Sequence, residues 1–367
     1  MLIRFYTART FKAHNMTYPI RAFSRHLREI DINVKFHFKS DESLSDCDVL
    51  CISTEVLKKS PLNKKPPDMY AMLEHFRKKV DTIIWFDMSA GTGTTLFSVL
   101  PYVDLYAKNQ LLKDRSLYTR QFYGNRIYSE YYHERFGIVD SYKVDSKSPA
   151  PSEALGKLAV SWNLGLGDYR TFSKMGRRLR IFWPFVNYHA RTTTPKNNRN
   201  VDISYRVSSN YHLDTVSYQR QETRRRLEKM TGDNKYNIFY EGKLPYYQYK
   251  DEIRRAKVMP SPFGLGEICF RDFECFIAGA ALFKPDMSHL ETWPDYYQPD
   301  VTYVSHAWDF SDFRDQLLGL LESPEESRCI AKDGQDRLLH SHSDAGGEEF
   351  ASHFAALIQK AVMNSSE

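Results

Sequence analysis

Residues that could bind a ligand or take part in a reaction gather in the segment 261–286, whose sequence is SPFGLGEICFRDFECFIAGAALFKPD. A loop rich in Pro and Gly runs into a helical stretch, which a small-residue break at Gly279 separates from an apolar strand. Arg271 and Glu274 lie about one turn apart at the start of the predicted helix. A guanidinium is suited to a forked pair with phosphate oxygens, and a carboxylate is suited to accept two hydrogen bonds from a ribose diol.

The position of this segment favours a ligand site. In an open α/β sheet, ligands bind where a strand's carboxyl end leads into a helix, and the free N–H groups at the helix start attract a diphosphate. Glu267, the last loop residue before the helix, is either a ligand-binding residue or a helix cap. Lys284 and Asp286 close the next strand at the same edge and are further candidates. Gly279 is another, because a residue without a side chain lets the next strand and helix approach a ligand closely. The alternative is that Arg271, with its acidic neighbours, forms a solvated helix face.

Two residues of the N-terminal half are candidates for a general base. Asp87 ends the apolar run TIIWF and precedes MSAGTGTT, so we expect its carboxylate at the carboxyl edge of a sheet. It either acts as a base or caps the following turn. His14, in a predicted loop after the first strand, is the second candidate, since a loop imidazole titrates near neutral pH. The run AGTGTT lacks the ending of a phosphate-binding loop.

The elements that must position these residues alternate between strand and helix, which predicts parallel sheets. The first half has predicted strands at 2–6, 34–38, 48–53, 82–86 and 103–107, and predicted helices at 18–30 and 70–79. The second half has predicted strands at 201–207, 236–240, 257–260, 280–283 and 301–304, and predicted helices at 216–230, 247–256, 271–278 and 310–321. A final amphipathic helix is expected within 350–362. We therefore predict an α/β protein with two Rossmann-like domains.

The chain length and one polar segment set the predicted domain limits. At 367 residues the chain is long for one core and suits two. The segment 188–200, YHARTTTPKNNRN, has no apolar periodicity and reads as a linker. We expect an N-terminal domain at 1–190, a C-terminal domain at 201–340 and a terminal helix at 345–363.

Composition excludes several classes of protein. The chain has 51 Lys and Arg against 46 Asp and Glu, a nearly balanced charge that does not indicate a nucleic-acid partner. The five Cys show no zinc-like spacing, and reduced thiols are expected. No apolar run approaches the length of a membrane span, which predicts a cytoplasmic protein. The basic and apolar segment 174–185 suggests peripheral contact with a membrane surface or, alternatively, a packed element with a solvated basic face.

The pattern R-x-x-E-x-x-x-x-G at Arg271, Glu274 and Gly279, followed by an apolar strand and Lys284-Pro285, resembles the donor-binding region of two-domain glycosyltransferases of the GT-B fold. It is most similar to the exostosin-like and alpha-1,3-fucosyltransferase type, and to bacterial or viral enzymes of polysaccharide synthesis. The resemblance covers mainly residues 201–325. It implies that Arg271 contacts the nucleotide diphosphate and that Glu274 contacts the ribose. The common retaining pattern places seven residues between two Glu, whereas six lie between Glu267 and Glu274.

The resemblance implies transfer of a sugar from a nucleotide-sugar donor to a glycan or lipid-linked glycan acceptor. No cofactor and no metal are expected, because the one D-x-D, at Asp46 and Asp48, opens a strand in the other half of the chain. Cationic side chains and a helix dipole would stabilise the leaving diphosphate instead. The alternatives are a nucleotide-sugar epimerase with the same two-lobed fold and a non-catalytic nucleotide-binding or glycan-binding module. The sugar, the nucleotide, the acceptor and the stereochemistry stay open.

Overall fold

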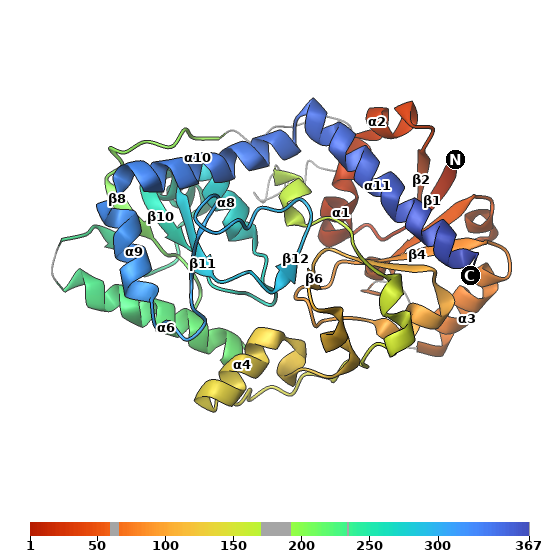
Figure 1. The fold of residues 1–367 in the computed structure, drawn as a ribbon, viewed down its shortest axis with the longest axis horizontal. Helices are drawn as coiled ribbons and strands as arrows, with labels where there is room; N and C mark the ends of the chain where they lie inside the picture. Colours follow the sequence, from red (N-terminus) through yellow and green to blue (C-terminus); the bar gives the residue numbers. More distant parts are fainter. Residues whose placement is uncertain (59–65, 170–191, 233–234, 367) are drawn as a thin grey trace.

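The computed structural model describes residues 1–58, 66–169, 192–232 and 235–366 of the chain. Two parallel sheets, each flanked by helices, lie at opposite ends of an elongated molecule (Figure 1). The basic and apolar segment 174–185 and part of the predicted linker lie outside the described residues.

The first sheet has the strand order β2-β1-β3-β4-β5-β7, and every neighbouring pair is parallel. Its strands are β1 (Leu2–Tyr6), β2 (Asn33–His37), β3 (Val49–Ser53), β4 (Thr82–Asp87), β5 (Leu105–Lys108) and β7 (Leu158–Val160). Side chains alternate between its two faces, because successive strand residues point in opposite directions. Ile84 and Phe86 of β4 pack in one apolar cluster, and Ile83 and Trp85 pack in another. The sheet is therefore covered on both faces, as parallel sheets usually are.

The second sheet has the order β13-β11-β10-β8-β9 and is also parallel. Its strands are β8 (Val201–Ser204), β9 (Ile238–Phe239), β10 (Ala256–Pro260), β11 (Ala281–Pro285) and β13 (Val304–His306). The expectation of a strand at 301–304 is wrong for all but its last residue. Asp300 has a φ of +59°, and its N–H donates to the carbonyl of Tyr303 in a turn, so the chain becomes extended only from Val304.

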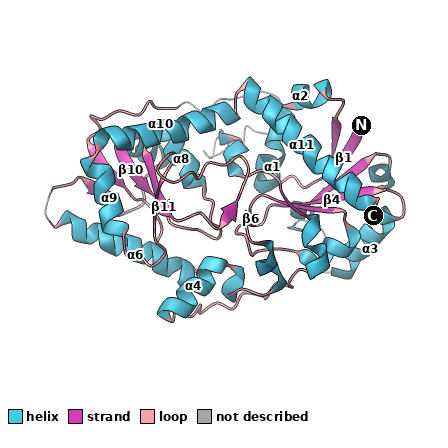
Figure 2. Cartoon of the chain, viewed as in Figure 1, coloured by secondary structure: helices cyan, strands magenta, loops and turns pink. Residues whose placement is uncertain are grey.

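Helices connect the strands in both halves (Figure 2). They are α1 (Phe11–Ala22), α2 (Ser24–Glu29), α3 (Pro66–Arg77), α4 (Ile127–Phe136), α6 (Asp214–Thr231), α7 (Tyr246–Arg255), α8 (Phe270–Ala278), α9 (Phe313–Glu322), α10 (Pro324–Ser341) and α11 (Asp344–Ser365). Short 3-10 turns occupy Glu42–Ser45, Thr54–Lys58, Phe97–Tyr102, Arg115–Thr119, Tyr123–Asn125, Ser152–Lys157 and Leu164–Leu166.

The predicted loop after the first strand is largely helical. Helix α1 begins at Phe11, because the Thr10 hydroxyl accepts a hydrogen bond from the N–H of Ala13 at 3.0 Å and caps the helix start. Pro19 lies inside α1, and the helix continues past it. His14 is consequently a helix residue and not a loop residue, which corrects the expectation from the sequence.

Helix α11 returns to the first sheet, as Figure 1 shows for the blue end of the chain. Its residues Phe350 and Phe354 are fully buried and pack against Phe86 of β4 and against Trp162. Two parallel α/β units with a C-terminal helix that crosses back to the first unit are the GT-B arrangement. The predicted fold class is therefore confirmed.

Helix α4 makes the opposite crossing. It belongs to the first half of the sequence, yet Tyr128 and Tyr132 are buried in the apolar cluster of the second sheet. The Tyr128 hydroxyl donates to the carbonyl of Gly264 at 2.6 Å. A two-stranded antiparallel ribbon, β6 (Leu111–Leu112) with β12 (Leu290–Glu291), also joins the two halves. The halves are thus connected by exchanged elements at three places.

Candidate functional site

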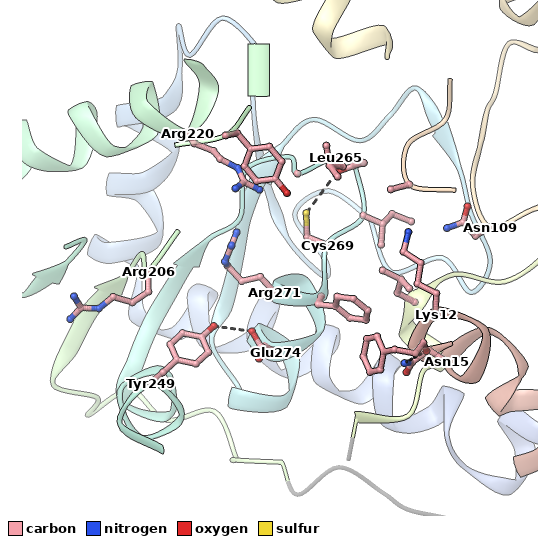
Figure 3. Close-up of a pocket in the computed structure, with 18 of the residues that line it drawn as sticks. Lys12, Asn15, Asn109, Arg206, Arg220, Tyr249, Leu265, Cys269, Arg271 and Glu274 are labelled. Carbon is pink, nitrogen blue, oxygen red and sulfur yellow. Dashed lines mark hydrogen bonds between the residues drawn. The ribbon is translucent and has the colours of Figure 1, made fainter. Parts of the chain in front are cut away.

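A cavity of about 1060 Å³ lies between the two halves. Residues of α8, of the loop before it and of α7 form one side, and residues from α1 and the ends of first-sheet strands form the other. In Figure 3, Lys12, Asn15 and Asn109 lie on the side opposite to Arg206 and Tyr249. The volume is within the range of cavities that hold a large small-molecule ligand.

The loop 261–269 leads from β10 into α8 and shapes the centre of the cavity. Asp272 makes a capping box with Cys269, because its carboxylate accepts the N–H of Cys269 at 3.0 Å. Gly264 and Gly266 line the cavity with backbone alone. Arg126 and Tyr128 hold this loop from the other half through the carbonyls of Leu265 and Gly264. The cap and these hydrogen bonds fix where α8 begins.

Arg271 lies in the first turn of α8 and lines the cavity. Its Nη1 is buried and has no hydrogen-bond partner among the residues that the structure describes. A buried charged donor without a partner costs free energy unless a ligand supplies an acceptor. The position suits an anionic group, because the free N–H groups at the start of α8 point to the same region.

Glu274 lies one turn after Arg271 on the same side of α8. Its Oε2 accepts a hydrogen bond from the Tyr249 hydroxyl at 2.9 Å (Figure 3), and its Oε1 lies 3.9 Å from Lys250 Nζ. Burial, and next the Glu274 carboxylate, raise the pKa of the Tyr249 hydroxyl well above its ordinary value. Tyr249 therefore stays a donor, orients one oxygen of Glu274 and leaves the other for a ligand hydroxyl.

Further cations line the same cavity, and the sequence analysis missed them. Arg206 follows the carboxyl end of β8 and forms an ion pair with the carboxylate of Glu252 at 2.7 Å. Arg220 donates to the carbonyl of Phe263 at 3.0 Å and covers the ring of Tyr211. Arg206 could have been predicted from the sequence, because it follows the end of a strand at the sheet edge where ligands bind. Arg220 gave no such signal, since it lies in the charged helix α6.

The net charge of the cavity wall is positive. Five cationic side chains and one carboxylate occur among the described lining residues, and the carboxylate is Glu274. The five cations are Lys12, Arg206, Arg220, Lys243 and Arg271. Cations that converge in a cavity of low polarity attract an anionic ligand such as a diphosphate.

Glu267, expected as a ligand-binding residue or a helix cap, is not among the residues that line the cavity, and the residue that caps α8 is Cys269. Its carboxylate is fully buried and accepts hydrogen bonds from the first half of the chain. The donors are the N–H of Thr92 at 3.1 Å, the Thr92 hydroxyl at 2.7 Å and the Gln110 amide at 2.9 Å. These groups occupy both oxygens, so Glu267 joins the two halves.

Lys284, Asp286 and Gly279 also lie away from the cavity lining. Lys284 is buried, pairs with Asp272 at 3.2 Å and donates to the carbonyl of Ser261. Asp286 accepts from Ser288 in the turn after β11. Gly279 ends α8 with a φ of +67°, a conformation that favours glycine. These three residues of the predicted site therefore stabilise the local structure.

Asp87 is occupied within the first half of the chain. Its fully buried carboxylate accepts from Tyr106 Oη at 2.6 Å and from Ser89 N at 2.7 Å, and it lies 3.2 Å from Lys108 Nζ. Burial acts to raise the pKa of Asp87, but the Lys108 ammonium and the hydrogen bonds outweigh it and hold the pKa below its ordinary value. The cavity lining does not include Asp87. This geometry does not suit a base for a ligand in the cavity.

His14 is adjacent to the cavity but faces away from it. Its Nε2 lies 2.9 Å from Asp168 Oδ2, and the Asp168 side chain is buried. The neighbouring Asn15 lines the cavity, and its amide oxygen accepts the N–H of Asp168 at 2.9 Å. A histidine held by a buried carboxylate has the arrangement that orients an imidazole for proton transfer. The structure brings Arg271 and Glu274 together and leaves His14 on the opposite side of α1.

Comparison with known proteins identifies the class. Residues 205–345 match a family model described as glycosyl transferase-like. The matched span contains α7, α8 and most of the cationic cavity wall. The second half of the chain is thus similar to the glycosyl transferase-like family, in agreement with the glycosyltransferase class predicted from the sequence. No curated protein matches the chain.

Several solved structures resemble the chain at low identity. An alpha-glucosyltransferase in complex with UDP-glucose and DNA containing an abasic site has 10% identity and a TM-score of 0.42, over 98% of this chain and 99% of that chain. Anabaena Alr3699/HepE in complex with UDP-glucose has 10% identity and a TM-score of 0.42, over 97% and 99%. Sucrose-phosphate synthase from Thermosynechococcus elongatus has 9% identity and a TM-score of 0.42, over 98% of each chain. Similarities at such low identity and TM-score do not indicate the substrate of this chain.

None of the helices within the described ranges is both long and apolar enough to cross a membrane.

Proposed function

We propose that the chain transfers a sugar from a nucleoside diphosphate sugar, bound in the cavity between its halves, to a glycan or lipid-linked glycan acceptor. The observation that carries the proposal is the buried, unpartnered Nη1 of Arg271, one helical turn before Glu274. A diphosphate oxygen supplies the missing acceptor for Arg271. A ribose diol supplies donors for Glu274, whose other contact is the Tyr249 hydroxyl.

The start of α8 supports this orientation of the donor. The diphosphate lies against Arg271 and the helix N-terminus, where the positive end of the helix dipole stabilises negative charge. The ribose lies next to Glu274, one turn further along α8. The sugar then extends toward the first half of the chain, where Asn15, Asn109 and Gln110 line the same cavity. Amide side chains suit sugar hydroxyls because they both donate and accept hydrogen bonds.

The reaction exchanges one bond for another at the anomeric carbon of the donor sugar. The bond from this carbon to the diphosphate oxygen breaks, and the diphosphate leaves with the electron pair. An acceptor hydroxyl oxygen forms the new bond to the same carbon and loses its proton to a base. Arg271 and the α8 N-terminus stabilise the charge that develops on the leaving diphosphate, which is a major contribution in group transfer. Neither predicted base residue lines this cavity. We retain His14, because its imidazole is held by Asp168 and it lies on the turn of α1 that borders the cavity.

Replacing Arg271 tests the donor site directly. We expect Arg271→Gln to weaken binding of the nucleotide by about 10- to 100-fold, because hydrogen bonds between charged groups contribute about 1.5 to 3 kcal/mol. Isothermal titration calorimetry with UDP, GDP, CMP and dTDP against wild type and variant measures the loss and identifies the nucleotide.

Arg255→Gln is the matched control. Arg255 lies on the neighbouring helix α7, pairs with Asp251 at 3.2 Å and is absent from the donor cavity lining. This variant should bind the nucleotide as wild type does. If wild type binds none of the four nucleotides, or if Arg271→Gln binds one of them as tightly as wild type, the proposed function is wrong.

A further inference from the structure

A second cavity of about 670 Å³ lies in the first half of the chain, between α1, α2 and the edge strand β2. No residue of its lining also lines the donor cavity. The N-terminal turn of α1 lies between the two cavities: Phe11 and Asn15 line the donor cavity, whereas Thr10 and His14 line the second one. A ligand in the second cavity is therefore close to the sugar end of the donor cavity.

The second cavity is cationic. Arg9, Arg21 and Arg28 line it, and its described lining contains no Asp or Glu. None of the three forms an ion pair with a carboxylate within the described part of the chain. Arg25, which lies on α2 but outside the cavity, instead pairs with Asp344 at 2.5 Å. The arginines that line the cavity therefore lack the compensating charge that their neighbour has.

Arg21 is the most constrained of the three. It is half-buried, its guanidinium lies 4.2 Å from the centre of the Phe36 ring, and its Nη1 donates to the Thr17 hydroxyl at 2.7 Å. Burial lowers the pKa of Arg21 to about 10. A cation removed from water without a carboxylate is unfavourable until an anion binds beside it. Arg9 repeats the stacking at 4.7 Å over Phe38, the residue that follows the end of β2.

The rest of the wall is apolar. Ile20, Leu27 and Ile32 form the buried floor, and Val34 and Phe36 continue it along β2. An inorganic anion would satisfy the arginines but leave the partly exposed Val34 and Phe36 in contact with water, and a neutral chain would cover Val34 and Phe36 but leave the arginines unpaired. A molecule that joins an anionic group to an apolar chain satisfies both parts of the wall.

We infer that this cavity is the acceptor site and that the acceptor is a lipid-linked phosphate compound. Its phosphate binds Arg9, Arg21 and Arg28, and its apolar chain covers Val34 and Phe36. The inference rests on the proposed function, because it gives the acceptor a chemical class. It also gives His14 a place in the reaction, since the imidazole lines this cavity with its Nε2 held by Asp168. An acceptor hydroxyl that passes the α1 N-terminus toward the donor meets His14 on the way.

Octyl phosphate, used below its micelle-forming concentration, is the probe. Calorimetry compares it with inorganic phosphate, which has the charge alone, and with octyl glucoside, which has the chain alone. Wild type is expected to bind octyl phosphate at least about ten-fold more tightly than either control. Equal binding of octyl phosphate and octyl glucoside, or of octyl phosphate and inorganic phosphate, would overturn the inference.

Substitutions locate the binding. Arg21→Gln and Arg28→Gln are each expected to weaken octyl phosphate binding about ten-fold, whereas Arg25→Gln, on the same helix as Arg28, is expected to leave it unchanged. Arg28 is exposed, so Arg28→Gln keeps the test valid if Arg21→Gln does not fold. Similar losses in all three variants would indicate a diffuse surface charge effect and contradict the site.

UDP binding separates this inference from the proposed function. Arg21→Gln should bind UDP as wild type does, because the two cavities share no lining residue. Octyl phosphate binding that depends on Arg21, without any nucleotide binding, would keep the anion site but remove its role as an acceptor site. Nucleotide binding that depends on Arg271, without octyl phosphate binding, would leave the donor site intact and overturn the acceptor inference.

Discussion

Arg271 and Lys284 lie on the same loop-helix-strand unit but have different uses. Lys284 Nζ has the Asp272 carboxylate at 3.2 Å, the Ser261 carbonyl at 3.2 Å and the face of Phe263. Arg271 Nη1 has no hydrogen-bond partner in the described part of the chain. A cation whose hydrogen bonds are all internal contributes to folding, whereas one that keeps an unused buried donor is available to a ligand. The distinction depends on contacts and not on residue type.

His306 makes protein stability depend on pH. It is buried among Phe283, Phe310 and Phe313, and burial lowers its pKa from 6.5 to about 4. The unfolded chain therefore binds a proton between these pH values while the folded chain does not. Its contribution to stability is complete above pH 6.5, falls as the pH decreases, and levels off below pH 4. We expect a loss of about 3 kcal/mol across this interval.

Urea unfolding of wild type and His306→Gln between pH 7 and pH 4 measures this effect. The variant should show a smaller decrease in the free energy of unfolding over the interval. His289 and His353 also have pKa values lowered by burial and remain in both proteins, so the difference between the two curves belongs to His306. Parallel curves would refute the assignment.

Single residues of the donor site were only partly predictable from the sequence. Arg271 and Glu274 were found because a loop, a helix start and a glycine break lie around them within one short segment. Glu267 and Asp87 are also acidic residues at the ends of loops or strands, but their carboxylates form hydrogen bonds with other groups of the protein. Thr92 lies 175 residues before Glu267, and no local pattern in the sequence reports such a pairing.

At the level of elements, α8 is set by its two ends. Asp272 and Cys269 fix the beginning, and Gly279 fixes the end with a left-handed conformation. A Cβ at Gly279 would meet the carbonyl oxygen of Thr193 and would lie 2.9 Å from Arg199 Nη2. Both the backbone conformation and the lack of space therefore require glycine at this position.

Gly279→Ala should destabilise the protein by about 2 kcal/mol or more, because a left-handed conformation costs an L-residue about 1 to 2 kcal/mol before any clash is counted. Gly319→Ala is the matched control. Gly319 lies inside α9, where a Cβ would meet nothing within 4 Å, so alanine should be neutral or stabilising by up to about 1 kcal/mol. Equal thermal unfolding midpoints for the two variants would contradict this account of the helix end.

The sequence predicted the interiors of most elements better than their boundaries. Strand β4 was recognised because six buried residues lie in a row. Helix α1 was placed too late, because Pro19 and several polar residues weaken its apolar periodicity while the cap at Thr10 depends on one hydroxyl. Helix α10 was missed, since Gly334 interrupts its buried face and contacts the ring of Phe276 in place of a larger side chain.

Considered as a whole molecule, the chain exchanges helices between its halves. Helix α4 from the first half buries Tyr128 and Tyr132 in the second core, and α11 from the end of the chain buries Phe350 and Phe354 in the first core. Each core therefore needs residues from the other end of the sequence. We expect the halves to unfold together and not as separate units.

Phe354→Ala tests this coupling. The side chain is fully buried against Phe86 and Trp162, and its removal should cost about 3 to 5 kcal/mol. Val362→Ala on the same helix is the control, because Val362 is exposed and should change stability little. For Phe354→Ala, unfolding followed by circular dichroism should show one transition at a lower midpoint. The stabilisation that a nucleotide gives should be lost in that same transition. Loss of the first core while UDP still stabilises the second would show that the halves are independent.

The contact between Gly91 and Gly266 has a consequence for how a donor enters. A Cβ at Gly266 would lie 3.1 Å from Gly91 Cα, so the two backbones touch, and Glu267 beside them is hydrogen-bonded to Thr92. This contact lies on the wall of the donor cavity, to which Gly266 belongs. If the cavity opens without breaking these buried hydrogen bonds, the contact between Gly91 and Gly266 must stay fixed. The halves would then rotate about this contact, and the parts of the cavity wall farthest from it would move most.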